Sequence, residues 1–238
     1  MLYTEKRLPN NARILWNYLS SGETHKDQHA DFVIGLGGDD INIALHCIDL
    51  YVSGITKKIV FTGGIGNSQL RHSSVPRAEW FFEEALSRGV PKRDILTSSE
   101  GFSFRDSLFQ AKDIIKNEET LAPSPRIIIV HKPYTLRMLY NMCTREWSHC
   151  WMNVSQISAD CDEYIAMQKE GGYVYELASL LVSHFRIYVD YMLHHNLGTI
   201  HDIPESVRLA FYELKDMGYT KYLKPQNPNY PYKLTFGL

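Results

Sequence analysis

A short apolar run that breaks into glycines is the feature that most constrains the fold of this 238-residue chain. Residues 59–61 read Ile-Val-Phe, which is typical of a strand buried on both faces. Three glycines follow within four positions, at Gly63, Gly64 and Gly66, and Asn67 and Ser68 come directly after them. Because a glycine lacks Cβ, this turn can bring its N–H groups close to a ligand. At the carboxyl end of a parallel strand, such a turn indicates a binding site for a small, anionic or nucleotide-like molecule.

Strand-like and helix-like patterns alternate along the chain up to about residue 158. Runs rich in β-branched and aromatic residues predict strands, and the segments between them repeat apolar residues at the 3.6-residue spacing of a helix. A first helix is expected at residues 10–19, and strands are expected at residues 31–36, 59–61, 94–97, 126–130 and 150–157. Strands that alternate with helices form parallel sheets covered on both faces. We therefore expect an α/β fold, a three-layer sandwich around a mostly parallel sheet of about five strands.

Only helix-like patterns follow the last expected strand. Apolar positions trace one face of a long helix over residues 174–192, and Asp202-Ile203-Pro204-Glu205 resembles a capping box that starts the last helix. These helices are expected to cap the sheet rather than to form an independent unit. The prediction is a single domain over residues 1–238, with a core at about 30–158 and a helical cap and tail at about 159–238.

Charge and hydropathy argue against two kinds of partner. The chain has 25 basic and 27 acidic residues, whereas non-specific binding to nucleic acid needs an excess of lysine and arginine. The most apolar stretch, residues 174–192, carries charged residues too deep for a membrane-spanning helix. Residues 1–7 lack the apolar segment of a secretory leader, and the four cysteines form no C-x-x-C pair. We expect a cytoplasmic protein with reduced cysteines and with neither a nucleic-acid nor a membrane partner.

The glycines after the first strand do not complete a known nucleotide-binding motif. In G-x-G-x-x-G, the third glycine after Gly35 and Gly37 would fall at the position of Asp40. The second strand ends in Thr62 rather than in the acidic residue that holds a ribose in dinucleotide folds. These departures argue against an ordinary NAD fold and against a standard class I methyltransferase. No Walker sequence, H-E-x-x-H or paired cysteine and histidine spacing occurs, so we predict neither a Walker-type NTPase nor a metal site.

Five short segments occur in the order that is found in one bacterial protein family. They run from the first strand to the helix after the fourth: Asp31-x-x-Ile34-x-Leu36-Gly37-Gly38, Thr62-Gly63-Gly64-Ile65-Gly66-Asn67-Ser68, Pro76-Arg77-Ala78-Glu79, Gly89-Val90-Pro91 and Ile129-Val130-x-x-Pro133-x-x-x-Arg137. With these segments the chain resembles the ElyC/SanA/YdcF family, whose members share a domain of unknown function. Because no membrane anchor of the SanA type is expected, the chain is most similar to the soluble YdcF-like branch.

The resemblance implies a Rossmann-like fold with a cleft beside the glycine turns. S-adenosylmethionine is the ligand associated with the YdcF-like branch, and no reaction is firmly assigned to it. Many family members have Asn and then Glu-Asn after the third strand, where this chain has Ser103, Asp106 and Ser107. Many also have a histidine three residues after the proline of the fourth-strand turn, where this chain has Leu136. An activity that needs that imidazole or those amides is therefore in question here, and the ligand can differ.

The candidate ligand-binding residues follow the first four strands. Gly63, Gly64 and Gly66 could hold a phosphate, carboxylate or ribose through backbone N–H groups, or could form a plain tight connection. Arg137 could grip an anionic group with its planar fork, or could form a surface ion pair. The full set is Gly37, Gly38, Asp39, Gly63, Gly64, Ile65, Gly66, Asn67, Ser68, Arg77, Ser103, Lys132 and Arg137.

Three residues are candidates for catalysis. His131 is the only histidine expected at the carboxyl end of a strand, so it is the candidate for proton transfer, with a structural histidine as the alternative. Glu79 is a candidate hydrogen-bond acceptor or general base, unless it only complements a helix dipole. Asp106 is a candidate partner on the adjoining helix. The leading function is binding of S-adenosylmethionine or a related nucleotide-like anion. The alternatives are hydrolysis or transfer on a phosphorylated or nucleotide-sugar substrate, and ligand sensing without turnover.

Overall fold

A computed structural model of the chain divides into two compact units. The α/β unit comprises residues 22–132 and 140–157, and the helical unit comprises residues 1–21, 133–139 and 158–238. Within these units the structure describes residues 7–21, 29–65, 74–101, 103–118, 125–147, 151–157, 160–168 and 173–224.

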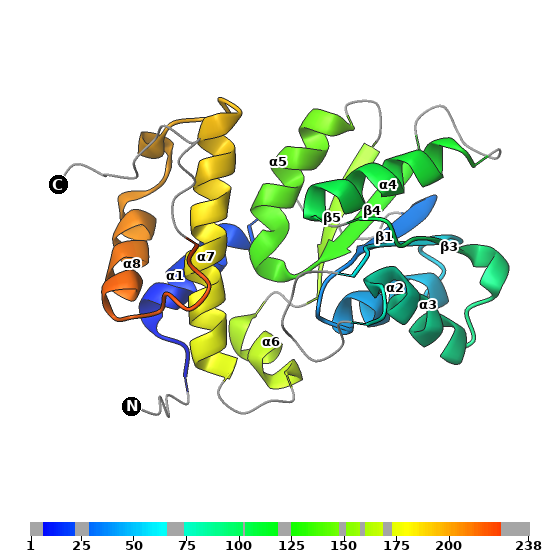
Figure 1. The fold of residues 1–238 in the computed structure, drawn as a ribbon, viewed down its shortest axis with the longest axis horizontal. Helices are drawn as coiled ribbons and strands as arrows, with labels where there is room; N and C mark the ends of the chain where they lie inside the picture. Colours follow the sequence, from blue (N-terminus) through cyan, green and yellow to red (C-terminus); the bar gives the residue numbers. More distant parts are fainter. Residues whose placement is uncertain are drawn as a thin grey trace. The chain divides into compact units, whose positions relative to one another are not determined.

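The α/β unit is built on a five-stranded sheet in which every neighbouring pair is parallel (Figure 1). The spatial order of the strands is β3-β2-β1-β4-β5. This confirms the predicted α/β, Rossmann-like architecture, and the sheet is wholly rather than mostly parallel. The strands are β1 (Phe32–Leu36), β2 (Ile59–Thr62), β3 (Ile95–Ser98), β4 (Arg126–His131) and β5 (Trp151–Gln156).

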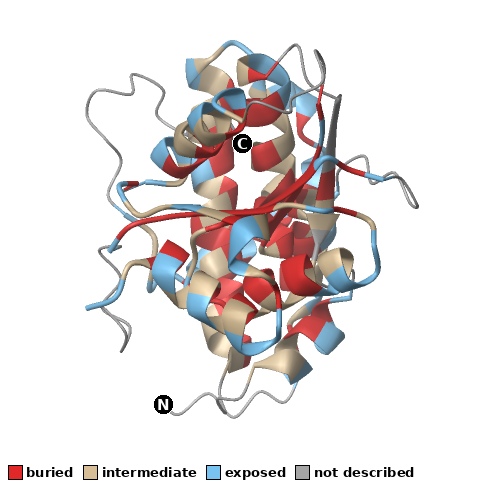
Figure 2. Cartoon of the chain, turned by 90° about the vertical axis from the view of Figure 1, so that its right-hand side faces the viewer, coloured by how far each residue is buried: buried red, intermediate tan, exposed pale blue. Residues whose placement is uncertain are grey.

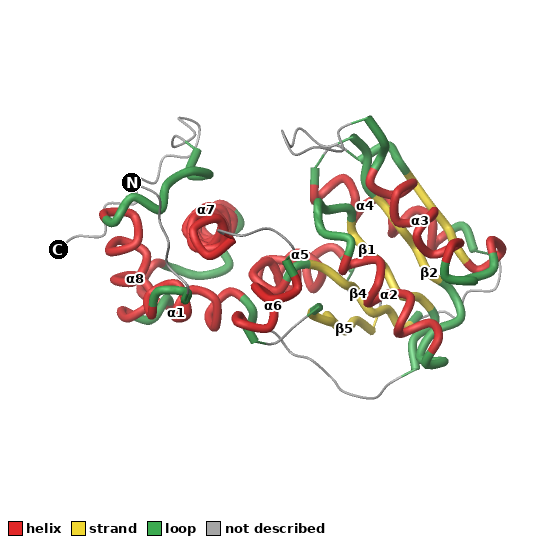
Figure 3. The backbone as a smooth tube through the Cα atoms, turned by 90° about the horizontal axis from the view of Figure 1, so that it is seen from below, coloured by secondary structure: helices red, strands yellow, loops and turns green. Residues whose placement is uncertain are grey.

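Helices flank the strands of this unit (Figure 3). Helix α2 (Asn42–Val52) packs on β1 and β4, and α3 (Arg77–Ser87) packs on β2 and β3. Helix α4 (Phe104–Lys116) packs on β1, β2 and β3 from the opposite face (Figure 1). The end of α5 (Leu136–Glu146) joins α4, where Lys112 Nζ donates a hydrogen bond to the carbonyl of Glu146. The sheet therefore separates two layers of helices, as the alternating sequence pattern predicts.

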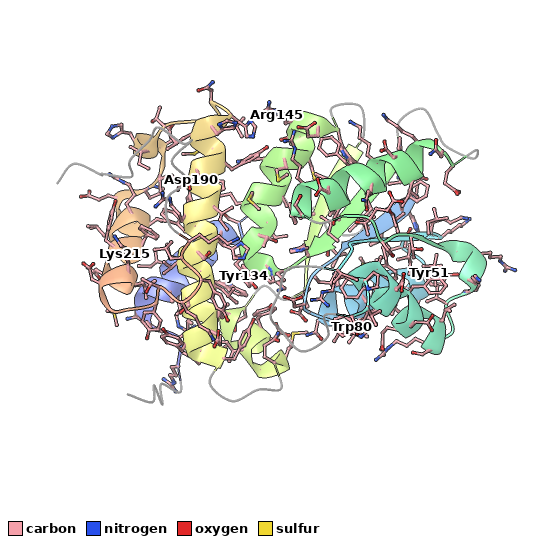
Figure 4. All side chains as sticks on the ribbon, viewed as in Figure 1. Tyr51, Trp80, Tyr134, Arg145, Asp190 and Lys215 are labelled. Carbon is pink, nitrogen blue, oxygen red and sulfur yellow. The ribbon has the colours of Figure 1, made fainter. Side chains whose placement is uncertain are left out.

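The core between the sheet and α2 and α3 is closely packed. Strands β1, β2 and β4 are almost wholly buried (Figure 2), and the rings of Phe61 in β2 and Phe81 in α3 meet edge to face at 5.6 Å. A Cβ on Gly35 would lie 2.8 Å from the Phe61 ring, so β1 needs a glycine opposite this side chain. Tyr51 and Trp80 extend from α2 and α3 on this side of the sheet (Figure 4), and the Tyr51 hydroxyl donates to Asp94 at 2.7 Å. Asp94 ends a short 3-10 helix, η1 (Lys92–Asp94).

The helical unit combines both ends of the chain. Helix α1 (Asn10–Leu19) packs on α7 (Tyr173–His194) and on α8 (Glu205–Asp216), and α6 (Cys161–Met167) packs on α7. Aromatic rings fill its interior around Tyr134, which is labelled in Figure 4 and lies in the 3-10 helix η2 (Pro133–Thr135). Its ring contacts those of Trp16, Tyr164 and His184.

The predicted capping box before the last helix is wrong. Pro204 precedes α8 and has no side-chain capping bond, because the Asp202 carboxylate is used one turn earlier. It accepts hydrogen bonds from the backbone N–H and the hydroxyl of Thr199, at 2.6 and 3.0 Å, and so closes the 3-10 helix η3 (Ile200–Asp202). An aspartate three residues after a threonine completes the same reciprocal bonding as the expected box.

Among the described residues, no helix has both the length and the apolar content that crossing a membrane requires.

His46 makes the stability of the α/β unit depend on pH. Its Nε2 lies 2.8 Å from the Ser155 hydroxyl of β5, and burial lowers the pKa of this imidazole below its ordinary value of 6.5. The unfolded chain therefore binds a proton more readily than the folded protein does. The stabilising contribution of neutral His46 is complete above pH 6.5 and is lost as the pH falls toward the lowered folded pKa.

We expect His46→Gln to flatten this pH dependence. Urea unfolding between pH 7.5 and 5 should show a smaller loss of unfolding free energy in His46→Gln than in the unaltered protein. His201→Gln, at an exposed histidine of η3, is the matched control and should follow the unaltered protein. An identical slope for His46→Gln and the unaltered protein would contradict this assignment.

Candidate functional site

The candidate site lies at the carboxyl edge of the sheet, where strand order reverses. Strand β1 sits between β2 and β4, so the connections after β1 and β4 leave from adjacent strands. Ligands in open parallel sheets bind at such a switch point. Gly38 follows β1, and His131 and Lys132 end and follow β4. His131 Nε2 and Lys132 Cε each lie 3.6 Å from the position that a Cβ on Gly38 would take. The structure thus brings these three predicted residues together.

His131 is enclosed by its surroundings. Its residue exposure is 6%, and its ring meets the Phe104 ring edge to face, with centroids 5.1 Å apart. Phe104 is the first residue of α4, so the imidazole is held between β4 and the opposite layer of helices. Lys132 is half-buried beside it. A neutral or charged imidazole next to a flexible ammonium group can donate hydrogen bonds to an anionic ligand.

The glycine turns pack against one another. The N–H of Gly37 donates to the Thr62 carbonyl at 2.6 Å, that of Gly63 to Ser98 at 3.0 Å, and that of Gly64 to Gly101 at 2.7 Å. A Cβ on Gly37 would lie 2.6 Å from the Thr62 oxygen, and a Cβ on Gly64 would lie 2.6 Å from the Ser99 oxygen. Gly63 has φ +133, which only glycine adopts readily. These N–H groups are therefore bound to the chain itself, as the tight-connection interpretation requires, rather than directed at a ligand.

The same turn fixes the start of α3. The carbonyls of Gly64 and Gly63 accept hydrogen bonds from the N–H groups of Arg77 and Ala78, at 3.3 and 2.9 Å. Arg77 is buried there, and its guanidinium pairs with the Asp39 carboxylate at 2.5 Å. The two side chains are 6% and 27% exposed, so the pair is shielded from water on the arginine side. Asp39 and Arg77 thus join the turn after β1 to the helix after β2.

Asp39 and Asp40 divide their roles. The Asp40 carboxylate accepts hydrogen bonds from the backbone N–H and side-chain amide of Asn42, at 3.0 and 2.8 Å. It is buried and opens α2, whereas Asp39 is turned to Arg77. Of these two adjacent aspartates, Asp40 takes the capping role.

Ser103 and Asp106 form a capping box at the start of α4. The Asp106 N–H donates to the Ser103 hydroxyl at 3.1 Å, and the Ser103 N–H donates to the Asp106 carboxylate at 3.0 Å. Both residues are exposed, and their capping of α4 is a structural role that needs no ligand.

Glu79 is also exposed, and its carboxylate lies 3.4 Å from the Ser99 hydroxyl. The predicted catalytic and binding roles of Glu79, Ser103 and Asp106 stay predictions.

Arg137 makes its contacts within the helical unit. Its Nε donates to the Tyr18 carbonyl at 2.7 Å, its guanidinium carbon lies 4.0 Å from the Tyr18 ring centroid, and it also contacts the Ser21 hydroxyl. These bonds hold the start of α5 against the end of α1. Desolvation by burial raises the pKa of the Tyr18 hydroxyl, while the nearby guanidinium opposes that shift.

Part of the predicted glycine turn lies outside the described residues. Gly66, Asn67 and Ser68 lie outside the described residues, and Ile65, the last described residue before them, is exposed. Sequence reasoning also missed two residues at this edge. The Thr62 hydroxyl is buried and has no hydrogen-bond partner among the described residues, and Phe104 packs on His131. The position of Thr62 between a buried strand and a glycine turn was the only signal, and nothing in the sequence marks Phe104.

One cluster in the helical unit has the residue types of a metal site. Oxygen and sulfur atoms of Asp160, Cys161 and Asp162 lie within 4.8 Å of one another. The Arg13 guanidinium occupies the position of a counter-ion, since it donates to Cys161 Sγ at 3.0 Å and to Asp162 at 2.6 Å. Asp160 caps α6 through the N–H groups of Asp162 and Glu163. These bonds explain the cluster without a metal.

Comparison with known proteins gives a relative but no activity. No family model matches the chain. An uncharacterized protein of Streptomyces coelicolor is 28% identical over 221 residues, which cover 91% of this chain and 94% of that protein. The aligned length therefore includes most of the α/β unit and of the helical unit.

The Asp39–Arg77 pair at the start of α3 is expected to be stronger than the surface pair Glu84–Arg88 at the end of that helix. Double-mutant cycles with Asp39→Asn and Arg77→Gln, followed by urea unfolding, should give a coupling of at least about 1 kcal/mol, because Arg77 is buried. Glu84 and Arg88 form the matched control, at 2.6 Å and with Arg88 51% exposed. Their cycle should give only about 0.3–0.5 kcal/mol. Equal couplings in the two cycles would show that burial of Arg77 does not strengthen its pair.

Proposed function

We propose that the α/β unit binds a nucleotide-like small molecule with an anionic group at the carboxyl edge of its sheet. S-adenosylmethionine is the first candidate, in line with the resemblance to YdcF-like proteins. The observation that supports this most is the grouping of His131 and Lys132 around Gly38 at the switch point between β1 and β4. Without a Cβ at Gly38, a ligand can approach the backbone between these two side chains.

The contacts in the structure favour side chains over backbone as the binding groups. The N–H groups of Gly37, Gly63 and Gly64 already have acceptors, so they have none to offer a phosphate or carboxylate without breaking turns. Lys132 can neutralise an anion as a point charge, and the partly exposed Asp39 can accept hydrogen bonds from ligand hydroxyls or an amine. A ligand with both an acidic group and a ribose or amine matches these groups.

The reaction is proposed only by class. His131 is the group through which a proton would be transferred, since it is the histidine that the structure places beside Gly38. With such a transfer the protein would act as a hydrolase or transferase on a nucleotide-like or phosphorylated substrate. If the ligand is bound and left unchanged, the protein is a ligand sensor.

A reducing compartment is proposed as its location. Cys47, Cys143 and Cys161 are buried free thiols, and burial raises the pKa of each of these three thiols. Buried protonated thiols are inert and are typical of cytoplasmic proteins.

A ligand panel tests the proposed function. Thermal unfolding should be followed with S-adenosylmethionine, its demethylated product, nucleotides and nucleotide sugars. A specific ligand at a hundred times its Kd stabilises by about 2.7 kcal/mol, which raises Tm by roughly 5–10 °C for a protein of this size. If only nucleotides or nucleotide sugars stabilise the protein, S-adenosylmethionine is the wrong ligand. If no member of the panel does, the proposed ligand class is wrong.

A Lys132→Met variant tests whether the ligand binds at the carboxyl edge of the sheet. Loss of a charged contact should weaken binding by about 1.5–3 kcal/mol, or roughly 10–150-fold in Kd. Lys92→Met, at an exposed lysine of η1, is the matched control and should bind as the unaltered protein does. If Lys132→Met and Lys92→Met bind the ligand with equal affinity, Lys132 is not part of the binding site. Mass spectrometry of the ligand after long incubation, compared with a His131→Ala sample, separates an enzyme from a sensor.

A further inference from the structure

The opposite edge of the sheet holds a cavity of its own. It has a volume of about 590 Å³ and is lined by residues 29–32, residues 54–58 and Arg126. These segments lead into β1, β2 and β4, so the cavity lies at the amino ends of three adjacent strands. In a parallel sheet all amino ends share one edge, and the candidate site described above lies at the other. Its volume is within the range of small-molecule sites.

The floor of this cavity is fixed by hydrogen bonds. The Ala30 N–H donates to the Ile55 carbonyl and the Asp31 N–H to the Arg126 carbonyl, each at 2.8 Å. The Asp31 carboxylate accepts the Arg126 N–H at 2.7 Å. The Thr56 hydroxyl is buried and lies within hydrogen-bond distance of the carbonyls of Asp31 and Lys58. The segments that lead into β1, β2 and β4 are therefore hydrogen-bonded to one another, and the cavity is part of the folded α/β unit.

The charge of this cavity is positive although that of the chain is −2. Lys57, Lys58 and Arg126 contribute three positive charges, and Asp31 contributes one negative charge. Lys58 is engaged, since its Nζ donates to the Arg93 carbonyl at 3.0 Å and lies 3.7 Å from the Glu118 carboxylate. Within the described part of the chain, the side chains of Lys57 and Arg126 have neither an ion pair nor a side-chain hydrogen bond, and both are exposed. Two cations thus face solvent at the rim of a partly open cavity whose backbone is held by hydrogen bonds.

We propose that this cavity, which we call the amino-edge cavity, binds the phosphate group of a small phosphorylated molecule. The Arg126 guanidinium can hold two phosphate oxygens with its fork, and the Lys57 ammonium can neutralise the remaining charge. The apolar side chains of Ala30 and Ile55 line the same space and give the organic part of the ligand a surface to pack on. The amino-edge cavity is a second binding site, distinct from the one in the proposed function.

Calorimetric titration with a small set of probes tests this proposal. Inorganic phosphate, ribose 5-phosphate, adenosine 5′-monophosphate and adenosine should be titrated at low ionic strength. The phosphorylated molecules are expected to bind more tightly than inorganic phosphate, because only they use the apolar wall, and adenosine is expected not to bind. If none of the phosphorylated probes binds at millimolar concentration, or if adenosine binds as tightly as adenosine 5′-monophosphate, the proposal is wrong.

Variants that each remove one positive charge then test where the probe binds. Arg126→Ala and Lys57→Met should each weaken the probe about tenfold or more, since each removes a charged contact. Arg126→Ala keeps the backbone N–H that Asp31 binds, and both side chains are exposed, so both variants should keep the Tm of the unaltered protein. Lys92→Met, which lies outside both proposed sites, should bind the probe unchanged. Loss of binding in Lys132→Met alone would assign the probe to the carboxyl edge, and equal loss in Lys92→Met would indicate non-specific attraction. Either result would overturn the proposal.

Discussion

The turn after β1 can pass directly against the turn after β2 because residues 37 and 63 carry no Cβ. The Gly37 N–H meets the Thr62 carbonyl at 2.6 Å, and a Cβ at Gly37 would lie 2.8 Å from the Cα of Gly63. This close approach brings Asp39 to Arg77 and sets the first turn of α3. The described parts of these two turns are therefore held together by the chain's own bonds, which lowers the entropy that ordering them on binding would cost.

The two edges of the sheet differ in chemistry. At the carboxyl edge the basic groups of Arg77, His131 and Lys132 are buried or half-buried, and their placement depends on glycine turns. At the amino edge the cations Lys57 and Arg126 are exposed around a cavity whose floor is held by backbone hydrogen bonds. A buried charge interacts more strongly with a bound anion, whereas an exposed one is screened by salt. Binding at the amino edge should accordingly depend more on ionic strength.

The sequence predicts the strands well because they are short, continuous and rich in β-branched residues. Residues 126–130, for example, could only be a strand buried on both faces, and β4 extends just one residue further. The N-terminal helix was placed correctly along the chain, but its packing with α7 and α8 depends on contacts over more than 150 residues, which no local pattern reports. Asp202 was assigned to the wrong helix because two helices begin within six residues of each other. Thr199 precedes η3, and Pro204 precedes α8.

The site residues were predicted less completely for a related reason. A glycine pattern shows where the chain turns sharply, but it does not show why the Cβ is absent. A bound ligand and a closely packed neighbouring turn both need a residue without a Cβ, so the sequence cannot distinguish them. Only the structure separates Gly37 and Gly64, which face backbone oxygens at 2.6 Å, from Gly38, which faces His131 and Lys132 at 3.6 Å. Arg137 likewise has the fork expected of an anion-binding residue, yet it serves the junction of α1 and α5.

Ligand binding by Gly38→Ala tests the central claim most directly. The tightest contact of the added Cβ would be with the end of the Ile43 side chain, at 3.1 Å, which can shift at little cost, so the variant should fold normally. If a ligand lies between His131 and Lys132, the methyl group occupies its space, and calorimetry should show affinity reduced about tenfold or more. Unchanged affinity in a folded Gly38→Ala protein would contradict the placement of the site at this edge of the sheet.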